Sequence, residues 1–199
     1  MTRIPFKCAR WGAQHACLGI ALFIITTTLL CAEPGADLVQ IQPPPNFEGP
    51  IAATPGAGTH IDAYVHRIPG SDRSTLLQVT TYDFGSKLEG VPKSELGDGA
   101  EKYLMQFLGG IERARAEFHA AKPTRTALGG VPAARVEWTG LARGQAMSGV
   151  MYCVIVDTVV VSFHTQGFDD SPVEDRKAAL HSIEAVTFRS KHSAPADAR

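Results

Sequence analysis

The chain has 199 residues, 44% of them hydrophobic, and 19 Lys and Arg against 20 Asp and Glu, a net charge of −1 with neutral histidines. The first 32 residues hold three of these cations and no acid, so residues 33–199 carry 16 cations against 20 acids, a net charge of −4. This acidic balance disfavours nucleic acid as a partner, because nucleic-acid-binding domains concentrate positive charge.

Residues 1–32 have the layout of a secretory signal peptide. Arg3, Lys7 and Arg10 precede the apolar run CLGIALFIITTTLLCA, which is shorter than the roughly 20 residues that a membrane-spanning helix needs. We therefore predict cleavage after Ala32 and an exported, periplasmic protein. The alternative is an uncleaved N-terminal membrane anchor, because Leu30 stands where a small residue is usual. Membrane contact is expected only through this segment, if it is retained.

Removal of the leader leaves Cys153 as the single cysteine of the chain. An exported domain with one cysteine forms no internal disulfide, so its stability must come from a hydrophobic core. Residues 33–199 are enough for one such domain. We predict an extended, proline- and glycine-rich N-terminal segment at 33–57, a single domain at 58–189, and a disordered tail at 190–199.

The first half of the predicted domain contains a hairpin and a long helix. Residues 59–67 and 74–84 are rich in β-forming residues and flank the turn sequence IPGSD, which predicts two paired strands. Apolar residues then recur at three- and four-residue steps from Ala100 to Ala114, which predicts an amphipathic helix. Asp98 and Glu101 fit a capping box at its start, and we expect Gly109 and Gly110 to mark a close approach to the sheet.

The second half contains three strands and a shorter helix. Residues 134–139 alternate apolar and polar side chains, which predicts a half-buried strand. Two β-prone runs at 150–156 and 159–166 are broken at Asp157, which predicts a second hairpin. In the 150–156 run both faces are apolar, so we expect a layer of structure on each side of the sheet.

The second helix is predicted from Ser171 as N-cap, Pro172 in the first turn and Glu174 as the capping-box acid. Val173, Leu180 and Ile183 continue its apolar stripe. The sequence AVTFR, which follows the helix, is expected to form a short strand or an extended end.

The order of these elements, together with GGVPAARVEW, the apolar hairpin and SIEAVTF, resembles the PsbP-like families. These are the extrinsic photosystem proteins and their bacterial envelope relatives of the DcrB and LpqT type. The resemblance implies an α+β fold, an α/β/α sandwich with a central antiparallel sheet of about six strands flanked by two main helices. It also implies a non-enzymatic role in binding or assembly. The chain departs from the families in lacking an aromatic-rich opening strand and a lipid-attachment site at Cys31.

Residues 58–67, GTHIDAYVHR, place potential metal ligands at every second position, on one strand face. The interpretation we favour is an ordinary half-solvated strand with His60, Asp62, Tyr64 and His66 toward solvent. The alternative is a metal site formed by His60, Asp62 and His66. Neighbours on one strand face lie about 7 Å apart, so one zinc ion could accept two of them and would need further ligands from elsewhere.

The sequence contains no recognisable catalytic constellation. Ser162 and His164 share a predicted strand face and Asp157 lies nearby, but no G-x-S-x-G turn is present, so we expect a partly exposed strand. Cys153 lies between apolar neighbours and is expected in the core. A hydrolase with scattered residues remains the alternative, and a deep cleft gathering His60, His66, His119 or His164 with a carboxylate would favour it.

From the sequence we therefore predict an exported, non-enzymatic binding or accessory protein of the cell envelope. We assign it no catalytic residue and no cofactor. Its expected partner is an envelope protein or a small ligand, and no nucleic acid. The alternatives are the metal-binding protein and the hydrolase described above.

Overall fold

The computed structural model describes residues 38–189. The predicted signal peptide and C-terminal tail lie outside this range. Within residues 38–189 no helix has both the length and the apolar character that crossing a bilayer requires.

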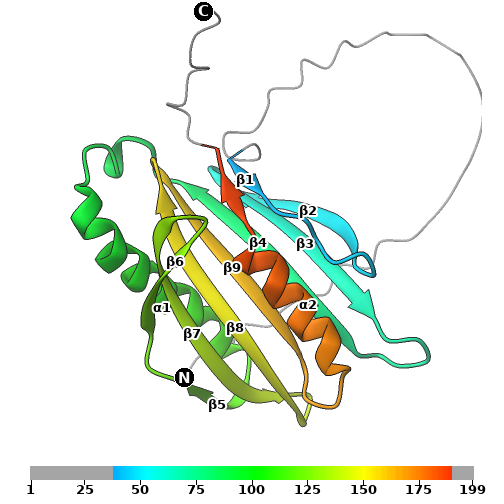
Figure 1. Ribbon diagram of the computed structural model, residues 1–199. Helices are drawn as coiled ribbons and strands as arrows, with labels where there is room; N and C mark the ends of the chain where they lie inside the picture. Colours follow the sequence, from blue (N-terminus) through cyan, green and yellow to red (C-terminus); the bar gives the residue numbers. More distant parts are fainter. Residues whose placement is uncertain (1–37, 190–199) are drawn as a thin grey trace, which may run out of the picture. The chain divides into compact units, whose positions relative to one another are not determined.

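The described residues form an antiparallel sheet of eight strands, a two-stranded ribbon and two α-helices (Figure 1). The sheet has the order β2-β3-β4-β9-β8-β7-β5, and β6 also pairs with β7. Its strands are β2 (Glu48–Gly56), β3 (Thr59–Arg67), β4 (Ser74–Asp83), β5 (Ala116–Ala120), β6 (Thr124–Leu128), β7 (Val131–Ala142), β8 (Gln145–Val156) and β9 (Val159–Phe168). The ribbon pairs β1 (Val39–Gln40) with β10 (Thr187–Phe188), and the helices are α1 (Leu96–Arg113) and α2 (Val173–Glu184).

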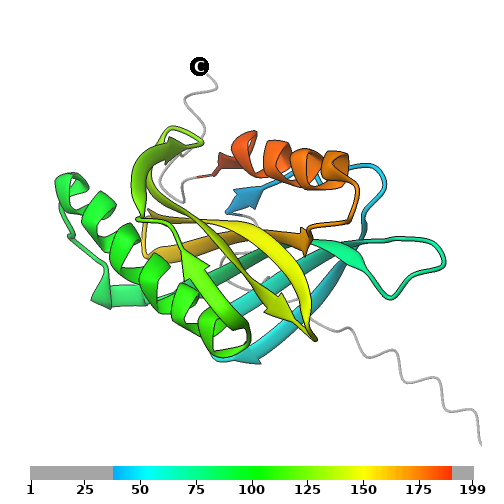
Figure 2. The same cartoon turned by 90° about the horizontal axis from the view of Figure 1, so that it is seen from below.

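The two helices lie on opposite faces of the sheet, α1 on one side and α2 with the β1-β10 ribbon on the other (Figure 2). This confirms the predicted α+β class and the α/β/α sandwich. The sheet has eight strands where about six were expected, because β2, β5 and β6 form in segments that carry no clear strand pattern. The short strand expected in AVTFR is β10, which pairs with β1 outside this sheet. In β2, for example, every residue is exposed, and the strand is held by its pairing with β3 at the edge of the sheet.

Strand β8 lies inside the sheet between β9 and β7, and it is covered on both faces. Met151, Cys153 and Ile155 belong to the core under α1. Tyr152 and Val154 belong to the core under α2. The two-sided apolar pattern thus predicted the layers correctly, and the hairpin with β9 turns at Asp157, where the backbone is left-handed (φ 53°).

The helices are offset from one another across the sheet. Helix α1 packs mainly on β7 and β8, whereas α2 packs mainly on β9 and β4. Figure 2 shows the offset, with α1 toward the β5-β7 side and α2 further along the sheet. Each helix therefore covers only part of the width of its face of the sheet. The uncovered part of one face and the uncovered part of the other lie toward opposite edges of the sheet.

The His60 strand face differs from the expectation. It points toward the layer that contains α2 and β1, so Tyr64 is 8% exposed and His60, Asp62 and His66 are half-buried. The predicted solvent face is therefore wrong. The sequence of the strand alternates as it does in a strand with one solvent-exposed face. Here, however, the polar face is the one that is buried, and the segments that bury it are remote in the sequence.

Both predicted capping boxes are also wrong. Helix α1 begins at Leu96, directly after a 3₁₀ turn at Lys93–Glu95, and no side chain caps it. Asp98 lies inside the first turn and pairs with Arg125 instead. Helix α2 has Pro172 at the N-cap position, again without a side-chain hydrogen bond.

The glycines of α1 also differ from the expectation. A Cβ atom at Gly109 or Gly110 would meet nothing nearer than the Arg113 guanidinium, at 3.7 and 4.0 Å. The close approach to the sheet is at Gly99, where a Cβ atom would lie 2.8 Å from Cδ1 of Ile155. The absence of a side chain at Gly99 therefore allows the first half of α1 to pack closely on β8.

A second close approach lies within the sheet, where the Trp138 ring of β7 covers Gly149 of β8. A Cβ atom at Gly149 would stand 2.6 Å from Cε2 of the Trp138 ring and 2.7 Å from the backbone oxygen of Thr165. Because Trp138 is 2% exposed, its ring has little room to move.

We predict that Gly149→Ala lowers the free energy of unfolding by about 1–3 kcal/mol, the usual cost of overpacking a core. Gly56→Ala is the matched control, because a Cβ atom there meets nothing within 4 Å. Urea unfolding followed by circular dichroism measures both variants. Equal midpoints for Gly149→Ala and the unchanged protein would contradict the packing of Trp138 on Gly149.

Candidate functional site

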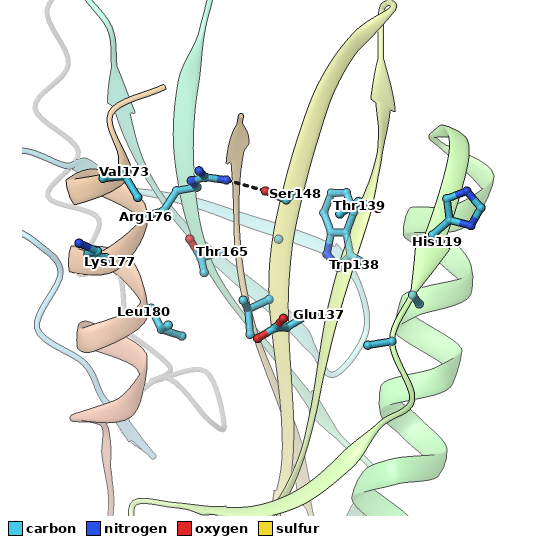
Figure 3. Close-up of a pocket in the computed structure, with 14 residues that line it drawn as sticks. His119, Glu137, Trp138, Thr139, Ser148, Thr165, Val173, Arg176, Lys177 and Leu180 are labelled. Atoms are coloured by element: carbon cyan, nitrogen blue, oxygen red, sulfur yellow. Dashed lines mark hydrogen bonds between the residues drawn. The ribbon is translucent and has the colours of Figure 1, made fainter. Parts of the chain in front are cut away.

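The main candidate site is a groove of about 530 Å³ between α2 and the uncovered part of β7 and β8, which we call the α2 groove. Its lining residues come from four strands or their ends and from one helix (Figure 3). They are His119, Ala120, Ala121, Glu137, Trp138, Thr139, Ser148, Gly149, Val150, Thr165, Val173, Arg176, Lys177 and Leu180.

The groove exists because α2 does not extend over β7. Val150 of β8 and Thr165 of β9 form part of the floor, and Val173 and Leu180 of α2 form part of the helical wall. Val173 is 49% exposed, one of three large apolar side chains among residues 38–189 that are exposed. The predicted α2 stripe therefore divides: Ile183 enters the core, whereas Val173 and Leu180 line the groove.

The helical wall of the groove also carries positive charge. Arg176 donates to the Ser148 hydroxyl at 2.5 Å and lies 3.3 Å from the Asp169 carboxylate, and its stem packs on Gly167. These contacts fix the guanidinium at the end of the groove near the start of α2 (Figure 3). Lys177, one residue along, is exposed and pairs with Glu174 at 3.3 Å.

One polar group on the floor has no hydrogen-bond partner. Thr165 is 3% exposed, and its hydroxyl oxygen is buried without a partner among the described residues. Figure 3 shows Thr165 below the Arg176 side chain, between α2 and the strand that carries Ser148. A buried hydroxyl without a partner lowers the stability of the protein. A ligand that forms a hydrogen bond with the Thr165 hydroxyl removes this cost, which favours binding.

The groove brings a histidine and a carboxylate, His119 and Glu137, into one lining. This partly meets the condition that would favour a hydrolase. However, the Glu137 carboxylate accepts from Arg135 at 2.6 Å, and Figure 3 shows the His119 ring pointing away from Glu137. Ser148 donates to Asp169 at 2.7 Å and has no contact with a histidine. The three groups are therefore not arranged as a nucleophile and its base.

The predicted metal ligands form two separate pairs. Nε2 of His60 lies 3.1 Å from a carboxylate oxygen of Asp62 in a small hollow of about 340 Å³ under β1. Nδ1 of His66 lies 2.8 Å from a carboxylate oxygen of Asp175 and so links β3 to α2. Among residues 38–189 no group of three or more His, Cys, Asp or Glu side chains is placed to hold a metal ion. Metal binding by His60, Asp62 and His66 stays a prediction.

Ser162 and His164 lie on the other face of the sheet, and both are buried, at 4% and 7% exposure. The expectation of a partly exposed strand is therefore wrong here. His164 accepts a hydrogen bond from the Trp138 indole nitrogen at 3.2 Å. Burial, with a contribution from the charge of Arg115, lowers the pKa of His164 to about 3, so the ring is neutral at physiological pH.

Cys153 is fully buried, as the sequence predicted. Burial raises the pKa of its thiol to about 12. The thiolate, which is the nucleophilic form, is therefore not available at neutral pH.

Neutral His164 makes folding sensitive to acid. The unfolded chain binds a proton at this residue near the ordinary pKa of 6.5, whereas the folded protein does so only near 3. Between these values acid favours the unfolded state, by at most about 1.4 kcal/mol per pH unit. We predict that His164→Gln, which keeps an acceptor for Trp138, loses less stability than the unchanged protein between pH 7 and 4.5. Urea midpoints at both pH values measure this, and equal losses would contradict a buried neutral His164.

The groove residues of α2 were not identified from the sequence as a site. Arg176 and Lys177 look like ordinary surface residues of a helix, and Val173 looks like part of its buried stripe. The only available signal was the two-sided apolar pattern, which predicts a covering layer but not how far that layer extends.

No family model and no curated protein matches this sequence. Among solved structures, LpqN of Mycobacterium tuberculosis, which is involved in cell envelope biogenesis, aligns at 12% identity. The alignment covers 79% of this chain and 86% of LpqN, with a TM-score of 0.52. PsbP of the cyanobacterium Synechocystis sp. PCC 6803 aligns at 12% identity over 80% of this chain and 97% of its own, with a TM-score of 0.49. The likeness to LpqN confirms the predicted resemblance at the level of the fold.

Proposed function

We propose that this chain is an exported, non-enzymatic binding protein of the cell envelope that takes up an amphipathic small molecule in the α2 groove. The observation that carries the proposal is the groove itself, with apolar walls, two cations at one side and a buried hydroxyl on the floor. Its volume of about 530 Å³ lies in the range of small-molecule sites.

The apolar part of the ligand is expected along Val150, Val173 and Leu180. Burial of such surface against a ligand is favourable at roughly 25 cal/mol per Å². Val173 supports this hypothesis. It is an apolar side chain, half exposed at the edge of the groove, so a ligand that covers it removes apolar surface from water.

The polar part of the ligand is expected near Arg176 and Lys177. Both cations stand on the helical wall, and Arg176 is already oriented by Ser148 and Asp169. An anionic or strongly polar head group therefore suits this end, with the Thr165 hydroxyl as a further hydrogen-bonding partner.

A binding role fits the site better than catalysis. Glu137 is paired with Arg135 and Ser148 with Asp169 and Arg176, so each of these groups has a structural partner. Export is supported by the signal-like layout of residues 1–32. LpqN, which shares the fold, is involved in cell envelope biogenesis.

The test uses 8-anilinonaphthalene-1-sulfonate, a fluorescent probe with an aromatic body and an anionic head. We expect saturable binding to the native protein and a dissociation constant raised about tenfold by Val173→Asp, which puts a charge on the apolar wall. Met105→Asp is the matched control, because Met105 is 48% exposed and lies on α1, away from the groove.

Near-UV circular dichroism confirms in each case that the variants keep their tertiary packing, since partly folded states also bind this probe. Equal loss of binding in the Val173 and Met105 variants, or no loss in either, would remove the α2 groove as the binding site. Specific turnover of an ester or peptide substrate would overturn the non-enzymatic role.

A further inference from the structure

The opposite face of the sheet holds a second hollow, of about 460 Å³, which we call the α1 cleft. It lies where α1 leaves β3, β4 and β9 uncovered. Its lining includes Thr80, Tyr82, Phe107, Arg115, His164 and Gln166. The proposed function makes no use of this cleft.

The α1 cleft has no acidic side chain in its lining, although the chain as a whole has more acids than cations. Two arginines, Arg113 and Arg115, line it. The adjoining hollow contains one carboxylate, Asp72, which forms no ion pair with Arg115. The local charge of the cleft is therefore positive.

Arg115 is half-buried and has only neutral acceptors. It donates to the Met147 sulfur, to the Ala114 carbonyl and to the Gln166 side-chain oxygen, each at 3.0 Å, and no carboxylate among residues 38–189 pairs with it. Its guanidinium also lies 5.9 Å from the centre of the Trp138 ring. These contacts orient the side chain while they leave its charge without a counter-ion, which is what a site for an anion requires.

Two neighbours of Arg115 add hydrogen-bond donors. The Gln166 oxygen accepts from Arg115, so its amide NH₂ remains to donate. His164 accepts from Trp138 through Nε2, so the neutral ring carries its proton on Nδ1, where no described residue accepts it. Arg115, Gln166 and His164 thus offer three kinds of donor in one lining.

The remainder of the cleft suits a hydroxylated ring. Tyr82 and Phe107 stack at 5.3 Å between ring centres and form an aromatic wall. The hydroxyls of Thr80 and Ser162 lie in the same lining, and Gln78 donates to Thr80 at 2.9 Å. Aromatic walls combined with a few placed polar groups are typical of small-ligand sites.

We propose that the α1 cleft binds an acidic sugar. Its carboxylate pairs with Arg115 and accepts from Gln166, and its ring lies against Tyr82 and Phe107. The ring hydroxyls exchange hydrogen bonds with the amides and hydroxyls of the cleft. This site is separate from the α2 groove, so an experiment that contradicts one of the two proposals leaves the other unaffected.

The test is isothermal titration of the protein with D-glucuronate, D-glucose and acetate. We expect D-glucuronate to bind and each of the other two to bind at least about tenfold more weakly, because glucose lacks the carboxylate and acetate lacks the ring. Arg115→Gln should abolish glucuronate binding. Arg67→Gln is the matched control, since it removes one exposed cation of β3 outside the cleft.

Gln166→Glu provides a second variant, because it places a carboxylate beside Arg115 and should weaken binding whether or not Arg115→Gln folds. Val173→Asp should leave glucuronate binding unchanged, which separates this site from the α2 groove. The proposal is overturned by absence of glucuronate binding, by equal affinity for glucose or acetate, or by unchanged binding in a folded Arg115→Gln or Gln166→Glu variant.

Discussion

Burial of β8 on both faces is the constraint on which the rest of this structure depends. From Met151 to Val156 every residue is buried, which requires one layer over Cys153 and another over Val154. Pairing with β7 on one side and β9 on the other satisfies the backbone groups of the strand. Helix α1 and helix α2 must therefore both reach the middle of the sheet, from opposite sides.

The helices meet this requirement while offset from one another, and the offset creates the two hollows. On the α2 face β7 and the first part of β8, around Ser148–Val150, are uncovered, and with the buried Thr165 hydroxyl of β9 they lie beside the cations of α2. On the α1 face the uncovered strands are β3, β4 and β9, which present amides, hydroxyls and the neutral His164. The same architectural feature therefore gives one groove suited to an amphiphile and one cleft suited to an acidic sugar.

Local patterns predicted the two hairpins, both helices and the core position of Cys153, because these depend on neighbours in the sequence. They did not predict which segments cover a strand face. The polar side of the His60 strand faces α2 and β1, and His164 lies under Trp138, 26 positions away. Candidate sites are harder still, since Arg115 and Gln166 meet across 51 positions and single-sequence periodicity contains no information on such pairs.

The most direct test of this account is hydrogen exchange of the backbone amides. Central burial of β8 predicts that amides at 151–156 exchange only through global unfolding, with a protection free energy equal to the free energy of unfolding from urea titration. The exposed edge strand β2 should exchange through local opening and therefore much faster. Amides of β8 that exchange as fast as those of β2 would contradict the two-sided cover of the sheet and the arrangement of both hollows.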